Sequence, residues 1–106
     1  MLLPTLFAAL ADPTRLAIVT RLSQGEATMG ELARPHQLTL PAITKHVGVL
    51  VDAGVVRRRK VGRTVVCTLR PQPLSEAQAW LGDLTSYWNQ AVDRLETLLT
   101  TPEEPR

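Results

Sequence analysis

The most informative stretch of the chain is residues 39–64, TLPAITKHVGVLVDAGVVRRRKVGRT. Its first half predicts a helix, because Thr39 or Leu40 can cap the helix and Pro41 lies in the first turn. The predicted helix ends at Gly54. The second half is rich in basic and β-branched residues and favours strands. The stretch therefore predicts a helix followed by a basic hairpin.

The two faces of this helix differ in size and polarity. Three apolar side chains cluster within about 60° of a helical wheel and are expected to face inward: Ile43, Val47 and Leu50. The opposite side carries few bulky groups: Pro41, Lys45, Gly48 and Asp52, flanked by Ala42 and Thr44. An outer face of this kind can lie close against another molecule.

The basic segment, residues 55–69, consists of two strand-like runs joined around Val61-Gly62. Apolar residues alternate along the second run, as on one side of a strand: Val65, Cys67 and Leu69. We therefore predict a two-stranded hairpin, ended by Pro71 and Pro73. Its tip carries Lys60, Gly62 and Arg63.

Two helices are expected before residue 25. Residues 3–11 read as a short apolar helix, and Asp12-Pro13 then supplies an N-cap followed by proline at the first helical position. The second helix runs to about Ser23, and Gly25 follows it. Its buried side is expected to hold three residues at three-residue spacing: Leu16, Val19 and Leu22.

A short helix is expected between these two helices and residue 39. Thr28 and Glu31 have the spacing of a capping box, in which each side chain accepts a hydrogen bond from the other residue's backbone N–H. Only one or two turns should follow, because Pro35 disfavours a helical conformation at Arg34.

The last segment has the strongest periodicity. Apolar residues recur at spacings of three and four: Leu74, Ala77, Leu81, Leu84, Trp88, Ala91, Leu95 and Leu98. Further apolar residues widen this face: Trp80, Tyr87, Val92 and Leu99. A helix over residues 74–100 would be about 40 Å long, too long to bury so broad a stripe against a small core. We expect it to pair with its counterpart in a second chain, although packing within its own subunit is the alternative.

The length of 106 residues predicts one domain, residues 1–106. Its expected parts are N-terminal helices (1–24), a helix-turn-helix (28–54), a β-wing (55–70) and a C-terminal helix (74–100). Hydrophobic residues make up 44% and charged residues 21% of the chain, which argues against a disordered protein.

Other features of the chain bear on its location. No window approaches the roughly 18 apolar residues of a membrane span. The apolar start lacks a basic region before it, which argues against a signal peptide. The single cysteine fits a reducing cytoplasm, where the protein is expected.

Charge is divided unevenly along the chain. Residues 15–70 carry ten basic and three acidic side chains, a net charge of +7, whereas the remainder carries two basic and seven acidic side chains, a net charge of −5. This asymmetry favours a surface that binds a polyanion, with ordinary solvated surface charge as the alternative.

The order of elements, helix-turn-helix and then a basic hairpin, is that of a mainly helical winged helix-turn-helix. In this arrangement the second helix of the motif enters the major groove of DNA and the hairpin follows the phosphates. The residues expected to contact DNA are Thr39, Leu40, Pro41, Ala42, Thr44, Lys45, His46, Arg57, Arg59, Lys60 and Arg63.

These segments resemble the ArsR-type (ArsR/SmtB-like) family of bacterial repressors over nearly the whole chain. The resemblance is sharpest at residues 41–46, PAITKH, and is supported by Asp12-Pro13-Thr14-Arg15. It implies a homodimer that binds an inverted-repeat operator, often its own promoter, and releases it on a signal. It also implies that the first and last helices form the dimer interface: Leu3, Leu6, Phe7, Leu74, Leu81, Leu84, Trp88, Ala91, Leu95 and Leu98.

The chain departs from the metal-sensing members of that family. They resemble one another through paired cysteines on the first helix of the motif, or through Asp, His and Glu sets on the last helix. Here the first location reads ATMGE at residues 27–31, and the last helix has no histidine. We therefore expect no metal site and no cofactor.

Cys67 and His46 have more ordinary expected roles. Cys67 is expected to be a buried, inert thiol, with a thiol-responsive repressor as the alternative. His46 is expected to pack and to donate or accept one hydrogen bond to backbone or phosphate, rather than to sense pH.

The sequence therefore predicts a dimeric, DNA-binding repressor whose partners are double-stranded DNA and a second copy of the chain. It carries no nucleophile motif or phosphate loop, which argues against an enzyme. A winged-helix module that binds other proteins is the alternative. The inducing signal, the operator and the regulated genes do not follow from the residues.

Overall fold

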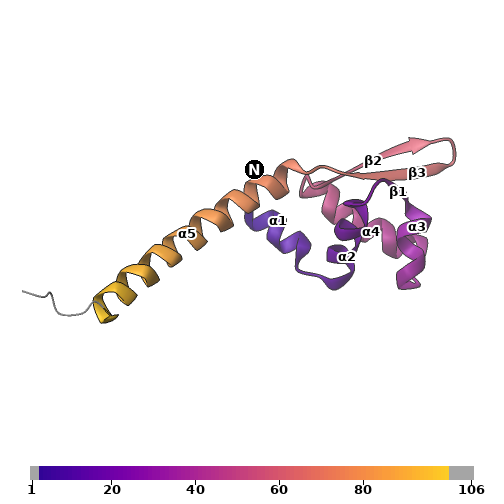
Figure 1. Ribbon diagram of the computed structural model, residues 1–106. Helices are drawn as coiled ribbons and strands as arrows, with labels where there is room; N and C mark the ends of the chain where they lie inside the picture. The colour runs from indigo at the N-terminus through magenta and orange to yellow at the C-terminus, as the bar shows by residue number, and fades with distance from the viewer. Residues whose placement is uncertain (1–2, 101–106) are drawn as a thin grey trace, which may run out of the picture. The chain divides into compact units, whose positions relative to one another are not determined.

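The computed structural model describes residues 3–100 and divides into two units, residues 1–76 and residues 77–106. The first unit holds the short helices and the sheet, and most of α5 makes up the second (Figure 1). In chain order the elements are α1 (Leu3–Leu10), α2 (Pro13–Leu22), β1 (Ala27–Thr28), α3 (Met29–Ala33), the 3₁₀ turn η1 (Arg34–His36), α4 (Leu40–Asp52), β2 (Val56–Val61), β3 (Thr64–Leu69) and α5 (Gln72–Thr100).

Side-chain caps begin α2 and α3 as the sequence predicts. Asp12 Oδ2 accepts from the Arg15 backbone N–H at 3.0 Å, and this hydrogen bond lowers the pKa of Asp12. Thr28 and Glu31 form the full capping box, at 3.1 Å and 2.8 Å. The hydrogen bond from the Thr28 backbone N–H lowers the pKa of Glu31. Each cap satisfies backbone donors that the helix itself leaves without a partner.

Thr39 caps α4, accepting from the Ala42 backbone N–H at 3.3 Å. The inward face of α4 is fully buried, because Ile43, Val47 and Leu50 are each 0% exposed. Around them α4 packs against α1, α2, α3 and β2. The prediction for this helix is confirmed, and its outer face is left to solvent.

The prediction for α2 is wrong at one residue. Leu16 is 51% exposed, and Ile18, which is 1% exposed, lies in the core with Val19 and Leu22. In a helix of 3.6 residues per turn, a step of three residues falls about 60° short of a full rotation. Residues spaced by three therefore move progressively around the helix. Leu16 therefore lies about 120° from Leu22.

The conformation expected at Arg34 is also wrong. Arg34 has helical backbone angles, φ −59° and ψ −48°, and the chain continues as η1. Pro35 is tolerated there because it lies at the start of the 3₁₀ turn, where its missing N–H would have had no partner. The turn ends at Gln37 in the left-handed conformation, φ 55°.

A three-stranded antiparallel sheet in the order β1-β3-β2 completes the first unit. The predicted hairpin is confirmed as β2–β3, with Val61 opposite Thr64 and Gly62 at φ 62° in the turn. In Figure 1 it runs along one side of the helices of this unit. The third strand, β1, is too short to give a sequence pattern, and it pairs Ala27 with Cys67. Cys67 therefore lies in the central strand.

Among residues 3–100, no helix has both the length and the hydropathy needed to cross a membrane.

We expect Leu50→Ala to lower the free energy of unfolding by about 2–5 kcal/mol, because Leu50 is fully buried and its truncation leaves a cavity. Leu40→Ala on the same helix is the matched control, since Leu40 is 65% exposed, and should change it by about 0.5 kcal/mol or less. Urea denaturation at one fixed protein concentration measures both. Equal losses would show that the assigned inward face of α4 is wrong.

Candidate nucleic-acid interface

The outer surface of α4 is open to solvent at the residues singled out from the sequence. Ala42 is half-buried, whereas the others are exposed: Thr39, Leu40, Pro41, Thr44 and Lys45. These side chains are short or flexible, and Lys45 supplies a positive charge. These side chains lie together in solvent because the opposite face of α4 is buried in the core.

A groove of about 700 Å³ lies between this surface and the hairpin. Its walls come from the start of α3, the start of α4 and the hairpin: Thr28, Met29, Gly30, Leu40, Thr44, Arg58, Arg63, Thr64 and Val65. The groove brings together three residues predicted from the sequence, Leu40, Thr44 and Arg63. Two arginines and several hydroxyl groups along an open groove suit an extended anion.

Arg58 is the charged groove residue that is absent from the residues expected to contact DNA. It lies opposite Cys67 in the β2–β3 ladder, and directly opposed residues point to the same face of a sheet. Its Nη1 lies 4.0 Å from the position that a Cβ on Gly48 of α4 would occupy. The signal was present in the sequence, because a two-residue turn at residues 62–63 places residue 58 opposite residue 67.

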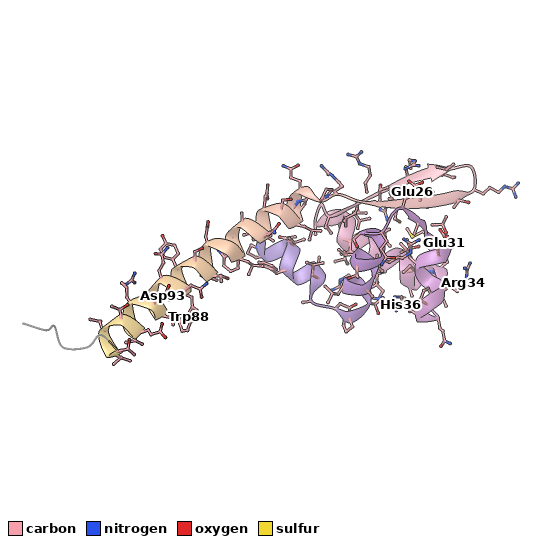
Figure 2. The ribbon with its side chains drawn as sticks, in the orientation of Figure 1. Glu26, Glu31, Arg34, His36, Trp88 and Asp93 are labelled. Carbon is pink, nitrogen blue, oxygen red and sulfur yellow. The ribbon has the colours of Figure 1, made fainter. Side chains whose placement is uncertain are left out.

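Arg57 and Arg59 lie on the other face of β2, because side chains alternate along a strand. Arg59 Nη2 donates to Glu26 Oε2 at 3.3 Å, and both side chains are 53% exposed. Figure 2 shows Glu26 beside the hairpin. The pair is too exposed to contribute much stability, but it gives Arg59 a partner outside the groove. Lys60 is exposed near the tip.

His46 contacts two charged side chains from another part of the chain. It is partly buried, and its Nδ1 lies 3.5 Å from Arg15 Nη1 and 3.8 Å from Asp12 Oδ2. Both contacts are with side chains at the start of α2. The expected hydrogen bond from His46 to phosphate stays a prediction. The sequence could not reveal this, because 31 residues separate His46 from Arg15.

Cys67 is 0% exposed, and burial raises the pKa of its thiol. Both properties disfavour the thiolate, which is the reactive form. Within residues 3–100, no group of three or more His, Cys, Asp or Glu side chains could hold a metal ion.

The predicted dimer residues fall into three groups by their exposure. Six lie exposed on α5: Leu81, Leu84, Trp88, Ala91, Leu95 and Leu98. Leu3, Phe7 and Leu74 are partly buried. Leu6 is 0% exposed, so it belongs to the core of its own chain rather than to a surface that a partner can reach. Figure 2 shows Trp88 on α5.

Comparison with known proteins places this arrangement in a family. Residues 10–59 match a family model described as a helix-turn-helix domain. The HTH-type transcriptional regulator Rv2034 of Mycobacterium tuberculosis is 40% identical over 84 residues, which cover 79% of this chain and 76% of that protein. The transcriptional repressor SdpR of Bacillus subtilis is 29% identical over 75 residues, which cover 71% of this chain and 83% of SdpR.

A solved structure is similar to this chain in both fold and sequence. The crystal structure of an ArsR family transcriptional regulator, RHA00566, superposes with a TM-score of 0.77 at 42% identity, covering 82% of this chain and 90% of that one. The fold and the sequence similarity agree. This chain belongs to the ArsR family of winged helix-turn-helix proteins, which are DNA-binding transcriptional regulators and not enzymes.

Proposed function

We propose that this protein is a repressor that binds an inverted-repeat operator as a homodimer, with α4 in the major groove and the β2–β3 hairpin as the wing. The observation that carries the proposal is the groove lined by Arg58 and Arg63, which adjoins the exposed face of α4. Similarity to SdpR, a transcriptional repressor, supports repression over activation.

The shape of α4 suits the major groove of DNA. That groove is about 12 Å wide, so a helix enters it deeply only if its outer side chains are small or flexible. Thr44 can hydrogen-bond a base edge or a phosphate, and Lys45 can reach a guanine or a phosphate. The apolar groups of Leu40, Pro41 and Ala42 can contact thymine methyl groups.

The wing supplies phosphate contacts, which position the protein and strengthen binding without reading sequence. Arg58 and Arg63 border the groove next to Thr44, so a DNA strand seated against α4 would pass both guanidinium groups. Lys60 adds charge near the tip. Arg59 has Glu26 as a partner and is assigned no contact with DNA.

The dimer is proposed from the exposed face of α5. Leu84, Trp88 and Leu95 are 52%, 69% and 56% exposed, and they follow the heptad spacing of a helix–helix seam. An apolar stripe of this length is expected to be covered, and a second copy offers an identical stripe. Two copies of α4 would then reach major grooves one DNA turn apart, about 34 Å.

The proposal is tested by fluorescence anisotropy with DNA from upstream of the protein's own gene and with shuffled DNA. We expect tight binding to the upstream fragment alone. Affinity should fall steeply with salt, and a plot of log affinity against log salt concentration should have a slope of about −0.9 for each phosphate neutralised. Equal binding to both fragments would exclude autoregulation. If neither fragment binds, the alternative of a module that binds other proteins is favoured. The same conclusion follows if variants with neutral residues in place of Lys45 and Arg63 bind DNA as the wild type does.

We expect Arg58→Gln to weaken operator binding about tenfold, or ~1.4 kcal/mol. The slope of log affinity against log salt concentration should become less negative by about one. Arg59→Gln removes the same charge from the neighbouring residue and is the matched control. It should weaken binding less than about twofold, because Arg59 faces away from the groove. Salt titrations of both variants measure the difference. An equal loss in both would mean that net charge alone, and not the groove, holds the DNA.

We expect Leu84→Glu and Trp88→Glu to abolish the dimer and operator binding together, because each places a charge within the proposed seam. Ser86→Glu adds the same charge to the opposite side of α5 and should leave both intact. Light scattering gives the oligomeric state, and anisotropy gives the affinity. A stable dimer in both leucine and tryptophan variants would refute the assigned seam.

A further inference from the structure

One side chain at the start of α2 joins three helices of the first unit. Arg15 Nε donates to the carbonyl oxygen of Ala9 at 2.6 Å, and Nη2 donates to that of Ala8 at 3.5 Å. Both carbonyls lie near the end of α1. The remaining nitrogen, Nη1, lies 3.5 Å from Nδ1 of His46 on α4. The guanidinium of Arg15 therefore bridges the end of α1 to α4.

The α1 side of this bridge is held firmly. The last carbonyls of a helix lack partners within it, and a cation there is favourable. The planar guanidinium has five N–H donors in fixed directions, so bonds to Ala8 and Ala9 also orient Nη1. The position of α1 is thereby linked to that of His46.

The contact with His46 depends on the imidazole being neutral. A neutral ring can accept a hydrogen bond from Arg15 at Nδ1, whereas a protonated ring has only donors and carries a charge of the same sign as Arg15. The carboxylate of Asp12 is close enough to be the alternative partner, with Oδ2 at 3.8 Å from the same Nδ1. Arg15 and Asp12 are the charged side chains in contact with His46 at the start of α2. Of the other elements that pack against α4, α1 carries no titratable side chain between Leu3 and Leu10, α3 carries Glu31, and β2 carries Arg57, Arg58, Arg59 and Lys60.

A change of partner at His46 would break the link between α4 and the end of α1. A donor and acceptor at 3.8 Å must approach to about 2.9 Å to form a good hydrogen bond. Ile43 and Val47, on either side of His46 in sequence, are fully buried, so the core fixes the backbone of α4 on both sides of this contact. Thr44 and Lys45, the proposed base-contacting residues, precede His46 directly.

We propose that Arg15 and His46 are positioning residues that hold α4 in its DNA-binding orientation, and that protonation of His46 transfers its contact from Arg15 to Asp12 and weakens operator binding. This inference rests on the proposed function. It differs from the expectation that His46 contacts phosphate itself, because a protonated His46 facing phosphate would strengthen binding.

The test is the operator affinity at pH 7.5 and pH 5.5, between which an ordinary histidine gains its proton. The chain has two histidines, and Figure 2 places His36 on the side of the helices away from the hairpin. We expect the wild-type affinity to fall at least about fivefold at pH 5.5, near the lower end of couplings between sites. His46→Gln, which can still accept from Arg15 but does not titrate, should have the same affinity at pH 5.5 as at pH 7.5, whatever that affinity is. His36→Gln should behave as the wild type.

A second variant tests the proposal if His46→Gln does not fold. Arg15→Lys retains the positive charge but has a single nitrogen in place of the planar guanidinium fork, so it cannot span from the end of α1 to His46 and should bind weakly at both pH values. Binding that strengthens at pH 5.5 in the wild type and not in His46→Gln would show direct phosphate contact and overturn the inference. A wild-type pH profile that persists in His46→Gln would also overturn it. Specific binding that is lost at every pH would instead refute the proposed function.

Discussion

Burial of one face of α4 is the constraint on which the rest of the structure depends. Ile43, Val47 and Leu50 are completely removed from water, and α1, α2, α3 and β2 all pack around them. Because a helix that buries one face must present the other, this packing places Thr44 and Lys45 in solvent. The core and the proposed DNA-facing surface are therefore two sides of a single helix, and the fold positions that surface without any added element.

The hairpin obeys a similar rule with a period of two. Val56 and Cys67 point into the core, and the register carries Arg58 to the same side of the sheet. A run of adjacent basic residues is thus divided between two faces, and only one of them borders the groove beside α4. Charge counted along the sequence overstates what any one surface can offer to DNA.

Patterns that depend on near neighbours in the sequence predicted most of the fold. The caps at Asp12, Thr28 and Thr39, the inward face of α4 and the turn at Gly62 each follow from residues a few positions apart. The family resemblance was also correct.

The features that sequence reasoning missed depend on distant parts of the chain or on finer geometry. The strand β1 exists because Ala27 finds Cys67 forty residues later, and His46 faces residues of α2. Leu16 was misplaced because spacings of three drift around a helix, and Leu6 was misplaced because apolarity alone does not separate core from interface. The face of Arg58 required the hairpin register, which alternation within one strand does not supply.

Because Cys67 is buried, the rate at which its thiol reacts with a reagent reports how often the structure around it opens. The chain has a single cysteine, and it lies in the central strand, paired with Ala27 on one side and Arg58 on the other. A thiol reagent can reach the sulfur only when the packing of β3 against α2 and α3 opens locally, so the rate of labelling measures how often that happens. Comparison of that rate with and without bound DNA would show how far the wing is stiffened by the complex, with no engineered probe in the protein.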